Sequence, residues 1–128
     1  MPKQQISPPG SKPLGPYSPA IGIGDLVFIS GQIGLDAVTG KPVEGGVTAQ
    51  ARQSLENLKA VLAAAGLGFG HVVKTVIFLT DMADFAAVNE VYKGYVTEPY
   101  PARSTIAVAA LPAGAKVEIE MIASRGAI

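Results

Sequence analysis

The first residue of this chain whose type and surroundings suggest chemistry is an arginine that follows a proline. Arg103 stands in Pro101-Ala-Arg-Ser104, where the rigid backbone of the proline favours an extended strand start. A guanidinium directed at a partly buried sheet face requires an anion, because it does not lose its charge. Two partners remain open. Arg103 forms an ion pair with Glu118 or Glu120, or it is a planar fork that binds a substrate carboxylate through two parallel hydrogen bonds.

Two carboxylates follow in Lys116-Val-Glu118-Ile-Glu120, where alternation places both on the same face of a strand. We interpret Glu120 as a solvated or interface ion pair. Glu118 is the candidate for chemistry, but its distance from Arg103 depends on the strand register, which the sequence leaves open. Ser30-Gly31, at the end of an earlier strand, is either a glycine turn or a backbone amide exposed to a ligand.

Other kinds of site find little support in the sequence. The absence of cysteine removes thiolate nucleophiles, disulfides and sulfur-containing zinc sites. The single histidine, His71, does not suffice for a multi-histidine metal site, and we assign it a structural or surface role. Gly66-Leu-Gly68-Phe-Gly70 lacks the spacing of a dinucleotide-binding loop and ends a helix instead of opening one. Ten basic and ten acidic residues give zero net charge, which argues against nucleic-acid binding.

A compact fold must position these residues, and 128 residues with 48% hydrophobic side chains predict a single domain, 1–128. Proline-rich residues 1–15 are expected to form an extended arm. The pattern predicts a loop over 31–46, a hairpin over 21–30, and strands over 71–80, 103–111 and 116–124. One helix is expected over 47–65, ended by Gly66. A second follows an N-cap at Asp81, with its buried face formed by Phe85, Val88, Tyr92 and Tyr95.

Two helices can cover only one face of such a sheet. Alternation in the last strand directs Glu118 and Glu120 away from the helices. We place Arg103 and Thr105 on the same side as Glu118, and Ile106 on the helix side. The strand over 71–80 is apolar on both faces, with Val73, Ile77 and Leu79 on one and Val72, Val76 and Phe78 on the other. The uncovered face predicts a homo-oligomer with Arg103 and Glu118 near a subunit boundary.

These segments together resemble the RidA family of imine and enamine deaminases, the YjgF-type proteins. The likeness covers nearly the whole chain. It is strongest at the C-terminal signature, Pro101-Ala-Arg-Ser104 followed by Leu111-Pro112 and Val117-Glu-Ile-Glu120. The earlier matching segments are Gly15-Pro-Tyr17-Ser18, Ile29-Ser-Gly-Gln-Ile33, Gln50-Ala-Arg-Gln-Ser-Leu-Glu-Asn-Leu58, Val73-Lys-Thr75 and Phe85 with Val88-Asn89. Several motifs in the same order and spacing are more specific than any one of them.

The resemblance implies an α+β fold of the bacterial chorismate-mutase type, a mixed sheet with two helices on one face, assembled as a homotrimer with clefts between subunits. It implies cofactor-independent hydrolysis of 2-imino acids and enamines, such as 2-aminoacrylate and 2-iminobutanoate, to 2-keto acids and ammonia. By resemblance, Arg103 binds the substrate carboxylate and Glu118 orients or activates the attacking water. The residues that would line the pocket are Tyr17, Ser30, Gly31 and Thr105, the last standing where many members have cysteine.

A non-catalytic trimer that binds a metabolite carboxylate in the same pocket is the alternative function. Retention of both Arg103 and Glu118 favours the enzyme. An endoribonuclease or translation inhibitor is a third function, weakened by zero net charge, few aromatic residues and a single histidine. No apolar signal segment opens the sequence, so we expect a cytoplasmic protein whose partners are a small molecule and its own copies, without membrane or nucleic acid.

Overall fold

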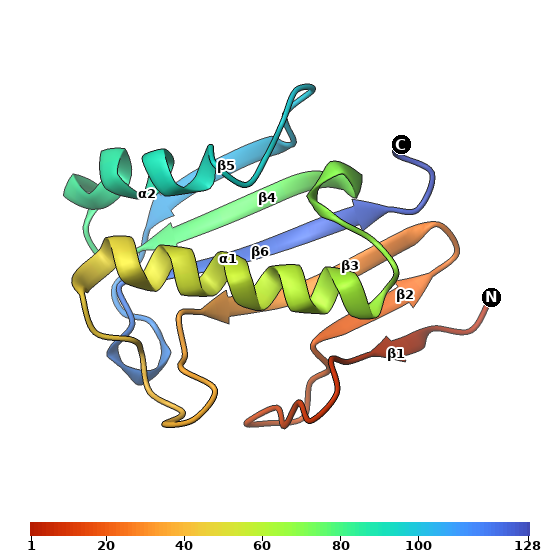
Figure 1. Ribbon diagram of the computed structural model, residues 1–128, viewed down its shortest axis with the longest axis horizontal. Coiled ribbons are helices and arrows are strands. Elements are labelled where there is room, and N and C mark those ends of the chain that lie inside the picture. The colour runs from red at the N-terminus through yellow and green to blue at the C-terminus, as the bar shows by residue number, and fades with distance from the viewer.

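The computed structural model describes residues 1–128, which form a six-stranded sheet and two α-helices (Figure 1). The strands are β1 (Gln4–Ile6), β2 (Ala20–Ile23), β3 (Leu26–Ile33), β4 (Val72–Leu79), β5 (Ala102–Ala107) and β6 (Val117–Ser124). The helices are α1 (Gly46–Ala64) and α2 (Phe85–Tyr92). The sheet order is β1-β2-β3-β6-β4-β5, and of these neighbours only β4 and β5 are parallel. The predicted mixed α+β architecture is confirmed.

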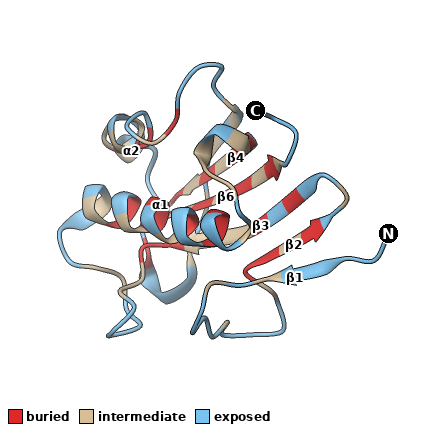
Figure 2. Ribbon diagram, turned by 45° about the vertical axis from the view of Figure 1, so that its right-hand side comes forward, coloured by how far each residue is buried: buried red, intermediate tan, exposed pale blue.

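Both helices lie on the same face of the sheet, as Figure 1 shows. Four- and three-residue spacing predicts an apolar stripe formed by Ala51, Leu55, Leu58, Leu62 and Ala65. The first four are buried against that face, while Ala65 is half-buried just beyond the end of α1. The buried side of α1 and the strands beneath it are seen in Figure 2. The helix ends where the pattern predicts, because Gly66 adopts a left-handed φ of 76° that other residues rarely adopt. One hydrophobic cluster joins these residues to the inner faces of β3, β4 and β6.

The second helix differs in part from its prediction. The Asp81 carboxylate accepts a hydrogen bond from the Ala83 amide at 2.9 Å, and so caps a short 3₁₀ turn that leads into α2. Val88 and Tyr92 are buried as expected, but Phe85 is 41% exposed. Tyr95 lies beyond the helix end, half-buried against the core. The predicted buried face was therefore wrong at Phe85, whose ring contacts a cation instead of the core.

Strand ends also depart from the sequence prediction. β1 forms inside the predicted arm, where it pairs with β2 and packs Ile6 against the core. β3 continues to Ile33, because a bulge lets it keep its pairing with β6. β5 ends at Ala107, not at 111, since its only neighbour, β4, ends at the paired Leu79. A second bulge in β4 buries Val72 and leaves Val73 40% exposed, the reverse of the predicted pattern.

No helix covers the other face of the sheet, which we call the open face. It carries Phe28 and Ile106, 43% and 46% exposed, around the half-buried Val76, Phe78 and Ile122. The predicted uncovered apolar face is therefore confirmed, although Ile106 was expected on the helix side. Neither helix has the length and apolar composition required to cross a membrane.

Candidate active site

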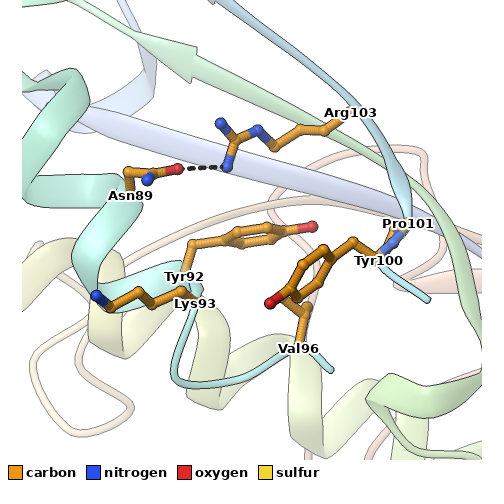
Figure 3. A pocket seen from close by; sticks show the side chains of 7 residues that line it. All are labelled: Asn89, Tyr92, Lys93, Val96, Tyr100, Pro101 and Arg103. Atoms are coloured by element: carbon orange, nitrogen blue, oxygen red, sulfur yellow. Dashed lines mark hydrogen bonds between the residues drawn. The ribbon is translucent and has the colours of Figure 1, made fainter. Parts of the chain in front are cut away.

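Arg103 extends from the edge strand β5 toward α2 and not toward the open face (Figure 3). Its partner in the parallel ladder is Thr75, a fully buried residue of the helix side. The guanidinium donates from Nη1 to Asn89 Oδ1 at 2.8 Å. It lies 5.1 Å from the ring centre of Tyr92 and 5.6 Å from that of Phe85. The prediction that Arg103 shares the face of Glu118 was therefore wrong.

Two aromatic rings and one amide define the orientation of this cation. Cation–π contact with Tyr92 and Phe85 favours a guanidinium flat against the rings, and the Asn89 carbonyl occupies one of its donors. The Tyr92 hydroxyl donates to Thr75 Oγ1 at 3.0 Å, and burial raises the pKa of Tyr92, so that this ring stays neutral. The surrounding cavity of about 400 Å³ is lined by Asn89, Tyr92, Lys93, Val96, Tyr100, Pro101 and Arg103 (Figure 3). We call this region the cation half-site.

Thr105 lies two residues further along β5, opposite Ile77 on the helix side. It therefore shares the face of Arg103 and not that of Glu118, contrary to the sequence prediction. Its Oγ1 is buried and has no hydrogen-bond partner within this chain. A buried hydroxyl without a partner is uncommon in folded proteins, and it leaves a free donor and acceptor beside Arg103.

Glu118 lies on the open face, opposite Phe78 of β4, with Glu120 two residues along the same face. Burial, and secondarily the charge of Glu120, raises the pKa of Glu118. The carboxyl borders a cavity of about 410 Å³ that also contains predicted pocket residues, namely Tyr17, Ser30 and Gly31. We call this group the acid half-site. The acid half-site brings together four of the predicted site residues, namely Glu118, Tyr17, Ser30 and Gly31.

A β-bulge shapes the acid half-site. The pairing of β3 with β6 shifts between Ile29 and Gln32, which leaves Ser30 and Gly31 opposite the single residue Glu120. The Ser30 hydroxyl donates to the Ser18 carbonyl at 2.7 Å and is thus occupied locally. A Cβ at Gly31 would lie 2.8 Å from the carboxyl carbon of Glu118. Glycine is therefore required here for the close approach of the carboxylate to the backbone.

The two half-sites of one chain are far apart. Arg103 and Glu118 belong to opposite faces, two strands apart and with ladder partners three residues apart on β4. Standard strand spacing and rise then separate their Cα atoms by about 14 Å. The ion pair considered for Arg103 does not form, since the chain's salt bridge joins Lys93 to Glu90. One small molecule cannot contact both half-sites of the same chain.

Three residues that contact the Arg103 guanidinium were not among the predicted site residues. Phe85, Asn89 and Tyr92 are spaced four and three apart, which places them on one helical face. This spacing, together with an arginine that requires a partner, is the sequence pattern from which their contact with Arg103 could be predicted. His71 has the structural role assigned to it, because its Nδ1 accepts a hydrogen bond from the Gly68 amide at 3.1 Å.

The fold and the half-sites define a small α+β protein with a cation on the helix side of a mixed sheet and a carboxylate on its open face. The chain belongs to the family described as Endoribonuclease L-PSP, whose model matches residues 8–125.

Similar proteins support the resemblance to RidA drawn from the motifs. Protein DfrA of Myxococcus xanthus is 58% identical over 114 residues, 88% of this chain and 87% of that one. The 2-iminobutanoate/2-iminopropanoate deaminase of Mus musculus is 51% identical over 113 residues, 88% of this chain and 84% of that one. A crystal structure of RidA from an Antarctic Psychrobacter has a TM-score of 0.87 at 46% identity, and the match covers 94% of this chain and 98% of that one. These matches confirm the resemblance to the RidA family that the sequence motifs indicate.

Proposed function

We propose that this protein hydrolyses 2-imino acids and their enamine tautomers to 2-keto acids and ammonia. The observation that carries the proposal is that the chain presents two groups on opposite faces of its sheet: an oriented, unneutralised guanidinium, and a carboxyl of raised pKa at a glycine bulge. Relatives about half identical to this chain, from mouse and human, are named 2-iminobutanoate/2-iminopropanoate deaminase. The enzyme needs no cofactor in this scheme, because an imine carbon is already electrophilic.

Arg103 is the proposed carboxylate-binding residue. Its Nη1 is held by Asn89, and the rest of the planar fork binds the substrate carboxylate through charge-assisted hydrogen bonds. This fixes the imine carbon next to the acid half-site, and such positioning lowers the entropy lost on reaching the transition state. Thr105, whose hydroxyl lacks a partner, offers a further hydrogen bond to the substrate.

Glu118 is the proposed acid–base residue. Its carboxylate takes a proton from water as the water oxygen bonds to the carbon of the protonated imine, and the C=N π pair becomes the lone pair of an amine. Glu118 then returns this proton to the amine nitrogen of the carbinolamine. The C–N bond breaks, the keto group forms, and the hydroxyl proton passes to the released ammonia, which leaves as ammonium. General acid–base catalysis of this kind contributes typically about 10²–10⁴-fold. A raised pKa suits both roles, because the group exchanges protons closer to neutral pH. Tyr17, Ser30 and Gly31 border the same cavity as proposed substrate contacts.

A complete site in this scheme requires two chains. The cation half-site of one subunit meets the acid half-site of its neighbour, since those of one chain face opposite sides of the sheet. Each subunit then contributes both halves to different sites, and the arrangement closes as a ring. We propose the homotrimer implied by the family resemblance, with the open face buried between subunits.

A coupled assay tests the activity. A serine or threonine dehydratase releases the imine in the presence of the purified protein, and keto-acid formation is followed against buffer. Faster release that is proportional to protein concentration is expected. An unchanged rate, with 2-keto acid still bound, would instead support the alternative of a metabolite-binding protein without catalysis.

Cleavage of RNA is the second candidate, favoured by the family description Endoribonuclease L-PSP. Zero net charge and a single histidine, which is engaged in a structural hydrogen bond, weigh against it. Incubation with single-stranded RNA at physiological salt separates the two functions. Cleavage that Glu118→Gln abolishes would favour the nuclease over the deaminase.

A further inference from the structure

A row of polar side chains on α1 faces the core beside the apolar stripe. Ser54 is fully buried, and its hydroxyl donates to the Gln32 carbonyl at 2.6 Å. Asn57 donates from Nδ2 to the carbonyls of Ile33 at 3.2 Å and Leu35 at 3.3 Å. Each of these acceptors lies just after the bulge of the acid half-site. The end of β3 and the residues that follow it are thus tied to the helix by three hydrogen bonds.

The same helix is also tied to the strand that carries Glu118. Gln50, 7% exposed, accepts a hydrogen bond from the Lys116 amide at 2.8 Å, two residues before Glu118. A Cβ at Gly34 would lie 2.8 Å from the Cα of Gln50, so backbone packs directly on backbone there. One rigid element therefore holds both strands that form the acid half-site.

The bulge explains why such a link is needed. Between Ile29 and Gln32 the ladder of β3 and β6 loses its regular register. Gly31 lies within this irregular stretch, against the carboxyl of Glu118. Burying hydroxyl and amide groups in a helix interface costs more than burying methyl groups unless each finds a partner. These groups all bond to backbone next to the site, which indicates a purpose beyond filling the core.

We propose that three polar side chains of α1 act as positioning residues for the acid half-site, holding the bulge against the carboxyl of Glu118. They are Gln50, Ser54 and Asn57. This inference rests on the proposed deaminase function. Without the link, the bulge moves away from Glu118, water enters, and the carboxyl loses both its position and its desolvation.

A double-mutant cycle tests the link. Ser54→Ala should lower kcat about tenfold with little change in KM, because small displacements of a catalytic group slow the chemical step. In a Glu118→Gln background the same change should lower kcat less than about twofold, since the group being positioned is already absent. Val61→Ala, buried on the same helix seven residues beyond Ser54, is the control for the loss of buried side-chain atoms. An equal loss from Ser54→Ala in both backgrounds would overturn the proposal.

A titration by ¹³C NMR provides a readout without turnover. Within one chain the charged or titratable groups around Glu118 on the open face are Glu120, Lys74 and the Tyr17 phenol, and in the proposed oligomer the neighbouring subunit's Arg103 joins them. Ser54→Ala leaves all of them in place, so a fall in the Glu118 pKa toward its ordinary value would report the loosened bulge. An unchanged titration would contradict the proposal. Asn57→Ala, at a half-buried position, serves if Ser54→Ala does not fold.

The two readouts separate this inference from the function on which it rests. If the wild-type protein shows no imine hydrolysis, the proposed function fails, while the Glu118 titration still decides whether α1 positions the bulge. If hydrolysis is present and the titration does not move in either variant, the positioning role fails alone.

Discussion

Two inactive variants should restore activity when they are combined in one oligomer. Arg103→Ala removes the cation half-site of a chain and leaves its acid half-site intact, and Glu118→Gln does the reverse. A hydrogen bond to a charged group is worth roughly 1.5–3 kcal/mol, so Arg103→Ala alone should lower kcat/KM at least about tenfold. Glu118→Gln removes the base and should lower kcat about a hundredfold.

The recovered fraction follows from the geometry of the half-sites. Arg103 and Glu118 of one chain lie on opposite faces, so in the proposed scheme each site combines halves of two chains. In a ring assembled at random from equal amounts of the two variants, about one neighbouring pair in four has both halves intact. The mixture should therefore regain about a quarter of wild-type kcat. A site formed within one chain would regain nothing.

The assay requires mixed oligomers of known composition. The two variants are co-expressed with different affinity tags, and species carrying both tags are isolated in tandem. In each isolated mixed trimer one of the three sites has both halves intact, so keto-acid release from an enzymatically generated imine should reach about a third of the wild-type rate. This rate is compared with that of each parent. Mixed oligomers that are as inactive as their parents, with subunit composition verified by mass spectrometry, would refute an intersubunit site.

Three further outcomes follow from the same geometry. Arg103→Lys should recover only part of the activity lost in Arg103→Ala, and only for substrates with a carboxylate, because an ammonium lacks the planar fork. Equal kinetics of Arg103→Lys and the wild type would contradict this. Gly31→Ala should abolish measurable turnover, since its Cβ meets the Glu118 carboxyl. Gly68→Ala, with open space around the position, should remain active. Full activity of Gly31→Ala would refute the close approach of the Glu118 carboxyl to the Gly31 backbone. Light scattering at micromolar concentration should give the mass of a trimer, and a monomeric mass would remove the shared site.

Local features of the sequence were sufficient for most of the elements. The spacing of Ala51, Leu55, Leu58 and Leu62 predicted α1, because a helix presents every third or fourth residue to the same side. Strict alternation in 117–123 predicted the two faces of β6. Four members of the acid half-site were also predicted, and they lie around one cavity, since motifs on β3 and β6 meet in adjacent strands.

The face of Arg103 was beyond the reach of local pattern. β5 is an edge strand with small residues on both sides, so alternation alone does not distinguish its faces. Its orientation is set by the parallel register with β4, a contact between segments far apart in the sequence. The guanidinium faces the helix side because aromatic rings accept its flat surface while its edge remains polar. Likewise, β1 exists only through its pairing with β2.

The raised pKa of Glu118 links catalysis to stability. Burial, and secondarily Glu120, favours the protonated form in the folded chain, so the native state binds this proton more tightly than the unfolded state. The resulting stabilisation is present below the ordinary value of 4.5 and is lost as pH rises through the raised pKa. Activity should rise over that same interval, because the ionised form is the base. The ionisation that enables catalysis therefore destabilises the fold.

Glu118→Gln separates these two consequences, since the amide has the shape of the protonated acid and does not ionise. Above the raised pKa the variant should have a higher Tm than the wild type while its turnover is lost. Below about pH 4 the two Tm values should converge, because the wild-type carboxyl is then protonated as well. Melting curves of both proteins across this range test the linkage, with Glu120→Gln as a second comparison. A variant that is less stable at neutral pH would mean that a cation, such as the neighbouring subunit's Arg103 across the proposed site, stabilises the Glu118 carboxylate more than burial destabilises it. The desolvation argument would then fail.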